Sequence, residues 1–79
     1  MKLKLKYLGK DKHERSVYED EQGNIYKDTD PREYNTDYIS QICTSYNNEF
    51  DGEPDTPIMY IFEELTNRDV IFNDKRVNW

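Results

Sequence analysis

The segment formed by residues 49–57, with the sequence EFDGEPDTP, constrains the fold of this 79-residue chain more than any other. It contains one glycine, two prolines and four acidic residues around a single phenylalanine. Proline lacks a backbone donor and glycine is costly to order, so the segment fits neither a helix interior nor a central strand. We therefore expect a loop, and loops are where small domains carry function. Residues 49–57 are called the acidic segment below.

The composition lies near that of disordered chains, with 34% hydrophobic and 35% charged residues, but 14% of the residues are aromatic. The seven tyrosines can bury their rings while keeping their hydroxyls hydrated or paired, so they can build a core. The length predicts a single domain, residues 1–79, that buries only roughly 60% of its unfolded surface.

Cys43 is the single cysteine, which excludes an internal disulfide and any two-cysteine metal motif. The lysine-rich start lacks the apolar stretch of a signal peptide, and no run approaches the ~20 apolar residues of a membrane span. These features predict a soluble cytoplasmic protein without a membrane partner.

The charge is unevenly distributed along the chain. Residues 1–15 carry a net charge of +4 and the remainder −10, which together give −6. An acidic surface repels nucleic acid and attracts basic protein surfaces, although a net charge of this size is also ordinary for solubility. We expect a basic protein partner and no direct contact with nucleic acid.

Residues 2–8 alternate between lysines and apolar side chains, which predicts a half-buried strand with lysines protecting a sheet edge. Residues 16–19 and 25–28 flank a Gly-Asn turn and predict a hairpin. Glu19 and Asp28 could lie beside the lysine row as cross-strand partners.

Residues 30–48 are ambiguous. A capping Asp30, Pro31 and a four-residue tyrosine spacing fit one helix, whereas the Thr, Ser, Ile and Tyr content of residues 38–46 favours a strand. We expect a turn at 30–36 and a strand at 38–46.

Residues 58–62 form the most apolar run and predict a central strand. A turn at 66–69 and a strand at 70–72 follow, and the terminal Trp79 could fold back onto the core. The predicted class is mainly β, a small curled antiparallel sheet or open barrel of five or six strands. The alternative is α+β with one helix near 31–46. The expected core consists of Leu3, Leu5, Ile42, Tyr60, Phe62 and Phe72.

Reactive side chains are scarce. Cys43 lies on an apolar face and His13 lies in a polar connection, so they make a poor nucleophilic pair. Asp51, Glu53 and Asp55 have the alternate spacing of calcium ligands, but Thr56 and Phe62 stand where such a loop needs Gly and Glu. We expect no enzymatic activity, no metal and no cofactor.

Three segments in this order, YLGKD (7–11), VYEDEQGNIYKD (17–28) and NEFDGEPDTPI (48–58), resemble a group of short proteins from gut Firmicutes and their mobile elements. Similar segments occur among accessory domains of large polyvalent proteins carried by conjugative elements and phages. Gly-Glu-Pro-Asp is the most specific piece, and residues 30–47 are longer than is usual for the group. The resemblance implies no activity. It implies a mobile-element setting, where small acidic proteins bind and block host defence or nucleic-acid-handling proteins.

The leading functional hypothesis is a non-enzymatic binding module of a mobile element, with a DNA-mimic-like inhibitor of a host protein as one form of it. Its acidic surface would meet a basic patch on a host or element protein. The alternatives are a structural domain within a homo-oligomer, built on Tyr and Ile faces, and a carboxylate-dependent enzyme. Phe50 either anchors the acidic segment inward or is an exposed binding hot spot. The predicted partner-binding residues are Glu49, Phe50, Asp51, Glu53 and Asp55.

Overall fold

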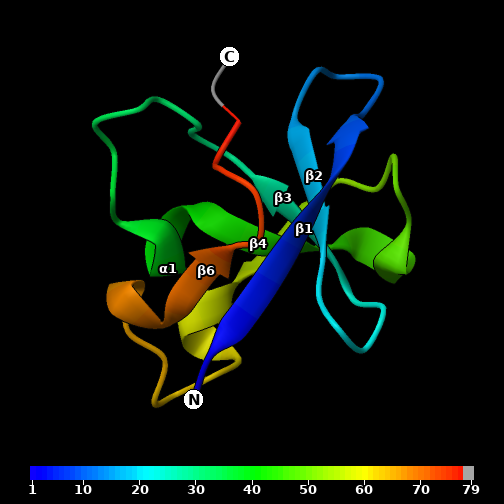
Figure 1. Ribbon diagram of the computed structural model, residues 1–79. Coiled ribbons are helices and arrows are strands. Elements are labelled where there is room, and N and C mark those ends of the chain that lie inside the picture. Colours follow the sequence, from blue (N-terminus) through cyan, green and yellow to red (C-terminus); the bar gives the residue numbers. More distant parts are fainter. Residues whose placement is uncertain (78–79) are drawn as a thin grey trace.

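A computed structural model describes residues 1–77 as one open six-stranded sheet (Figure 1). The strand order is β5-β4-β3-β2-β1-β6. The strands are β1 (Leu3–Lys10), β2 (Ser16–Glu19), β3 (Ile25–Asp28), β4 (Ile42–Ser45), β5 (Pro54–Pro57) and β6 (Val70–Phe72). The predicted mainly β class is confirmed. The sheet is mixed rather than purely antiparallel, because β6 pairs with β1 in parallel.

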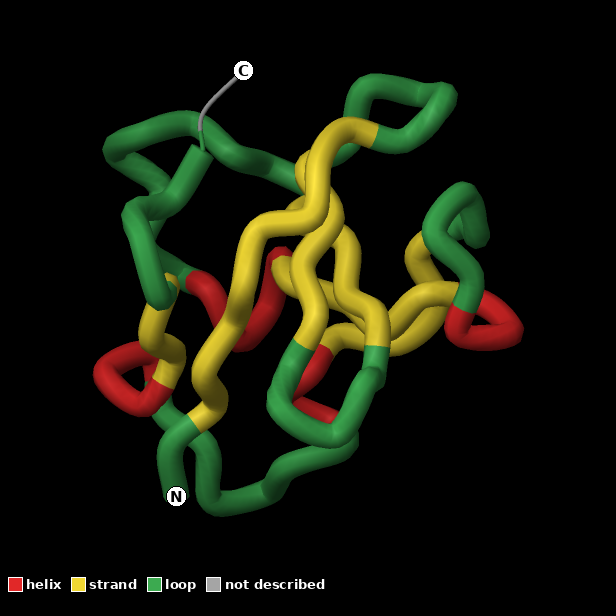
Figure 2. Tube along the Cα trace, turned by 45° about the vertical axis from the view of Figure 1, so that its right-hand side comes forward, coloured by secondary structure: helices red, strands yellow, loops and turns green. Residues whose placement is uncertain are grey.

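The helical elements are short and lie at the ends of strands (Figure 2). They are α1 (Tyr38–Gln41) and the 3₁₀ turns η1 (Tyr46–Asn48), η2 (Ile58–Tyr60) and η3 (Asn67–Asp69). The 30–48 region therefore matches neither expectation fully. One helical turn forms at 38–41, and the chain becomes extended at Ile42, where β-branched Ile42 and Thr44 pair with β3.

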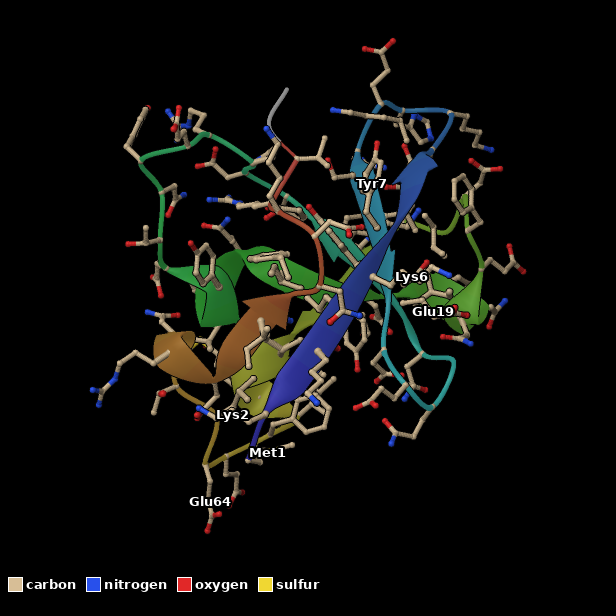
Figure 3. All side chains as sticks on the ribbon, in the orientation of Figure 1. Met1, Lys2, Lys6, Tyr7, Glu19 and Glu64 are labelled. Atoms are coloured by element: carbon tan, nitrogen blue, oxygen red, sulfur yellow. The ribbon has the colours of Figure 1, made fainter. Side chains whose placement is uncertain are left out.

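The alternation in residues 2–8 does form a strand, with Leu3 and Leu5 buried and the lysines exposed. The edge position predicted for the lysine row is wrong, because β1 lies between β2 and β6. Glu19 lies opposite Lys6 as expected (Figure 3), whereas Asp28 is fully buried opposite Ser16.

The predicted hairpin is confirmed, and Asp20 shapes its turn. The Asp20 carboxylate accepts hydrogen bonds from the backbone N–H groups of Gln22 and Asn24, both at 2.9 Å. It also accepts one from the Tyr26 hydroxyl at 2.7 Å. Burial would raise the pKa of Asp20, but these hydrogen bonds outweigh burial and hold the pKa below its ordinary value.

The core lies on one face of the sheet. Leu3, Leu5 and Ile42 are buried there as expected, and Phe62 and Phe72 pack partly buried against it. The prediction that Tyr60 belongs to the core is wrong, because 71% of the residue is exposed. The other buried members of this cluster are Tyr18, Tyr26, Ile58, Leu65 and Val70.

The strand predicted at 58–62 is also wrong, since residues 58–60 form η2. The Ile58 carbonyl accepts hydrogen bonds from the N–H groups of Ile61 and Phe62, both at 3.0 Å. Ile58 and Phe62 consequently turn toward the core, while the three residues between them face outward. A short apolar run has no period that distinguishes a strand from a helical turn.

The strand in this part of the chain is β5, inside the acidic segment that we expected to be a loop. It lies at the sheet edge and pairs with β4, with Ser45 opposite Pro54 and Cys43 opposite Pro57. Prolines are tolerated on an edge strand because one side of the strand needs no donor. They also leave this edge few donors for adding another strand.

The chain after β6 returns over the sheet. The Val77 N–H donates to the Tyr18 hydroxyl at 3.0 Å, and the Arg76 guanidinium donates from Nε to the buried Asp28 carboxylate at 3.0 Å. The prediction for Trp79 lies outside the described residues. Within residues 1–77, no helix is long and apolar enough to cross a membrane.

Candidate functional site

Residues 46–53 form a closed loop that presents most of the acidic segment. The Tyr46 N–H donates to the Glu53 carbonyl at 2.9 Å and closes the ends of the loop. Inside it, the Glu49 N–H donates to the Tyr46 carbonyl and the Gly52 N–H donates to the Glu49 carbonyl, both at 3.2 Å. Compact loops with joined ends are frequently functional. We call residues 46–53 the 46–53 loop.

Gly52 is required at its position by close packing. A Cβ on Gly52 would lie 2.5 Å from the Tyr46 carbonyl oxygen and 2.5 Å from the Ser45 hydroxyl oxygen. The Ser45 hydroxyl itself donates to the Glu49 carbonyl. The loop backbone is therefore folded tightly onto the end of β4.

Two consecutive asparagines turn the chain into the loop. Asn47 and Asn48 have φ angles of 55° and 56°, in the left-handed region that asparagine tolerates better than most residues. The Asn48 side chain accepts from the Ile25 N–H at 2.7 Å and donates to the Gly23 carbonyl at 3.0 Å. These bonds tie the loop to the β2–β3 turn and explain why the strained conformation persists.

A buried ion pair lies under the loop, on the sheet face opposite the main core. The Lys27 ammonium lies 2.8 Å from the Asp11 carboxylate, and both side chains are fully buried. Lys27 is flanked in register by Val17 and Cys43. The same ammonium donates to the Phe50 carbonyl, so Lys27 fixes the loop to the sheet.

Asp11 is held by further hydrogen bonds. Its carboxylate accepts from the backbone N–H groups of His13 at 2.8 Å and Arg15 at 2.9 Å. Burial would raise the pKa of Asp11, but the Lys27 ammonium and these N–H groups outweigh burial and hold the pKa below its ordinary value. The ionised carboxylate thus organises the 10–15 turn and positions Lys27.

Phe50 packs against the sheet and is still partly exposed. Its ring centroid lies 5.6 Å from the Lys27 ammonium, and its ring edge approaches Gly9, where an added Cβ would be 3.6 Å away. Even so, 39% of the residue remains exposed. Tyr46, at the start of the loop, is 59% exposed.

The four acids of the acidic segment are all exposed, but they differ in their partners. Asp51 accepts a hydrogen bond from the Lys12 N–H at 2.8 Å. Glu53 lies 3.1 Å from the Arg15 guanidinium and 3.4 Å from the His13 imidazole. Glu49 and Asp55 form no ion pair within residues 1–77. The structure thus separates Asp51 and Glu53, which attach the loop to the 10–15 turn, from Glu49 and Asp55, whose side chains have no hydrogen-bond or ion-pair partner within residues 1–77.

Cys43 and His13, the residues considered as a nucleophilic pair, lie in different environments. Cys43 is buried, and burial raises the pKa of its thiol, which favours the unreactive protonated form. His13 is engaged with Glu53. Across the described part of the chain, no group of three or more His, Cys, Asp or Glu side chains is arranged to hold a metal ion.

Sequence reasoning missed Lys27, Asp11, Tyr46 and Asn48 as members of this region. The Asn47-Asn48 pair before the acids was an available signal, because asparagine favours left-handed turns. The burial of Lys27 had no local signal, since it depends on two loops that meet over one strand.

Comparisons with protein-family models, with curated proteins and with solved structures found no match for this chain.

Proposed function

We propose that this chain is a non-enzymatic protein-binding module whose 46–53 loop, with the adjoining Asp55, meets a basic patch on another protein. The observation that carries the proposal is a pair of exposed aromatics, Tyr46 and Phe50, on a loop beside the free carboxylates of Glu49 and Asp55. Aromatic anchors bordered by charged residues are typical of the energetically important part of protein interfaces.

The loop is held in place before any partner arrives. Lys27 holds the Phe50 carbonyl, Lys12 holds Asp51, and Asn48 joins the β2–β3 turn. A preorganised loop loses little conformational entropy on association, so more of the contact energy becomes affinity. The left-handed Asn47 and Asn48 support the same interpretation, because strained backbone clusters at binding sites.

The exposed carboxylates of the acidic segment favour a partner with a basic surface. The Arg15 guanidinium offsets the charge of Glu53, and the Lys12 backbone N–H engages the Asp51 carboxylate, which leaves Glu49 and Asp55 as the acids of the segment without a side-chain partner within residues 1–77. Exposed acids at an interface steer a basic surface and act mainly on the association rate. The mobile-element setting remains a prediction from the resemblance and belongs to this proposal.

The test compares two doubly neutralised variants as baits in a lysate of the source cell. Glu49→Gln with Asp55→Asn removes the free charges of the site. Glu63→Gln with Glu64→Gln removes the same number of exposed charges elsewhere and serves as the matched control. We expect wild type and control to capture one basic protein that the site variant loses, with a several-fold slower and less salt-sensitive association of the purified pair. Equal capture and kinetics for both variants would refute the site.

A further inference from the structure

The Arg76 guanidinium is bound by the chain that follows β3 (Figure 1). Its Nε donates to the fully buried Asp28 carboxylate at 3.0 Å. Its terminal nitrogens donate to the backbone carbonyls of Asp30 at 2.6 Å, Arg32 at 3.1 Å and Asn35. A guanidinium presents its N–H donors as a planar fork, which such a spread of acceptors fits and a compact ammonium does not. We call these acceptors the guanidinium site.

The guanidinium site has an aromatic wall and an open flank. The Arg76 Cζ lies 5.1 Å from the centroid of the Tyr38 ring, within the range of a cation–π contact. Beside them lies a hollow of about 300 Å³, which Glu33 and Lys75 also line. Glu33 is exposed and forms no ion pair in the described part of the chain, whereas Lys75 belongs to the segment that carries Arg76. The hollow therefore leaves room, next to an acid, for the rest of a cationic ligand.

The acceptors of the site are held by hydrogen bonds that do not involve the bound guanidinium. The second oxygen of Asp28, Oδ1, accepts from the Gln41 amide at 3.1 Å and from the Asp30 N–H at 3.2 Å. The Gln41 amide also donates to the Asp30 carbonyl at 2.9 Å. The Asp30 carboxylate accepts from the Arg32 Nε and from the Asn35 amide, both at 2.6 Å. These bonds position the acceptors independently of the guanidinium, as in a preorganised receptor.

The segment that supplies the guanidinium, residues 73–77, is held less firmly, and we call it the strap. Its residues 73–75 are exposed. Beyond the guanidinium, Val77 forms hydrogen bonds with the Tyr18 hydroxyl at 3.0 Å and the Ser16 hydroxyl at 3.3 Å. Segments with exposed backbone and few buried apolar contacts open locally at a lower free energy than global unfolding requires. The strap therefore resembles a ligand more than it resembles a part of the core.

We propose that the guanidinium site is a binding site for an arginine side chain of another protein, and that the strap occupies this site as an internal ligand until such a chain displaces it. The net charge of −6 attracts basic segments, and an incoming chain gains the contacts of the hollow that Arg76 leaves open. Asp28 and Lys27 are neighbours in β3, so their side chains point to opposite faces of the sheet. The site does not include the 46–53 loop, and its failure would leave the proposed function standing.

The first test fills the emptied site with a small probe. In Arg76→Ala, methylguanidinium should bind with a roughly millimolar dissociation constant and raise the melting temperature by several degrees at about tenfold excess over that value. Methylammonium at the same concentration should have no effect, because it lacks the planar fork. At about 10 mM a guanidinium salt hardly denatures, since its denaturing effect grows in proportion to molar concentration. Wild type should not respond at this concentration, because the strap fills its site.

The matched control is Asp28→Asn with Arg76→Ala, which contains no unpaired buried charge at the site and should not respond to methylguanidinium. If Arg76→Ala is unfolded by itself, methylguanidinium should restore its fold. Failure of methylguanidinium to stabilise Arg76→Ala would overturn the proposal. Equal stabilisation by methylammonium, or of the double variant, would overturn it as well.

An oligoarginine peptide tests displacement of the strap in the wild-type chain. It should quicken hydrogen exchange of the Val77 N–H, which the docked strap donates to the Tyr18 hydroxyl. An oligolysine peptide of the same length carries the same charge and should leave this exchange rate unchanged. An equal effect of the two peptides, or no effect of oligoarginine at any concentration, would contradict displacement by arginine.

Discussion

Replacing the buried lysine under the 46–53 loop tests the structural basis of the site. In Lys27→Met the apolar stem is kept and the ammonium is removed, which leaves the Asp11 carboxylate buried beside the more distant Arg15 guanidinium at 3.9 Å. Removing one partner of a buried ion pair costs about 3–5 kcal/mol. Two backbone N–H groups still hold Asp11, so we expect a value near the lower end, about 3 kcal/mol.

That loss is large for this chain, because native stability is roughly 0.05–0.15 kcal/mol per residue, or about 4–12 kcal/mol here. Urea unfolding followed by circular dichroism would measure it. Lys4→Met is the matched control, since Lys4 is exposed, and it should change the free energy of unfolding by no more than about 0.5 kcal/mol.

A second substitution separates the ion pair from side-chain packing. In the Lys27→Met background, Asp11→Asn removes the unpaired charge while its amide oxygen can still accept from the N–H groups of the 10–15 turn, so part of the loss should be recovered. Hydrogen exchange of the 46–53 amides should quicken in Lys27→Met, because Phe50 loses its anchor. A Lys27→Met variant within about 1 kcal/mol of wild type, with unchanged exchange in the loop, would refute this reasoning.

Three further changes probe other parts of the structure. Arg76→Ala leaves the fully buried Asp28 carboxylate without its cation, so the urea midpoint should fall by the equivalent of about 3 kcal/mol; an unchanged midpoint would mean that the chain after β6 is not docked. Gly52→Ala should cost about 1–3 kcal/mol in the same assay, because its Cβ would collide with backbone and hydroxyl oxygens, and a neutral result would contradict the packing of the loop. The lowered pKa of Asp20 contributes stability that is present above the ordinary value of about 3.8 and is lost as pH falls below it. Unfolding measured across that range should therefore be less pH-dependent in Asp20→Asn, and equal slopes for wild type and variant would argue against the hydrogen-bonded carboxylate.

The parts of the fold that sequence predicted have strong local signals. The alternation that buries Leu3 and Leu5 identifies β1, and the Gly23-Asn24 turn identifies the β2–β3 hairpin, because period-two patterning and turn chemistry act between near neighbours. The apolar run that begins at Ile58 has no such period, and it curls into η2 instead of forming a strand.

The sequence pointed to the segment that carries the candidate site but not to the contacts that hold this segment in place. Gly52 and the prolines around it indicated a loop, yet Pro54 and Pro57 also suit an edge strand, a possibility that depends on where the sheet ends. The anchoring of Phe50 by Lys27 joins residues 23 positions apart, and no local pattern in the sequence encodes such a contact.

The proposed binding surface requires the 46–53 loop to be held in one conformation before a partner arrives, and backbone ¹⁵N relaxation measures this most directly. The hydrogen bonds of Tyr46, Asn48 and Phe50 predict order parameters of about 0.85 across the loop, equal to those of β3 beneath it. Order parameters below about 0.6 across the loop, with β3 rigid in the same sample, would contradict a preorganised binding surface.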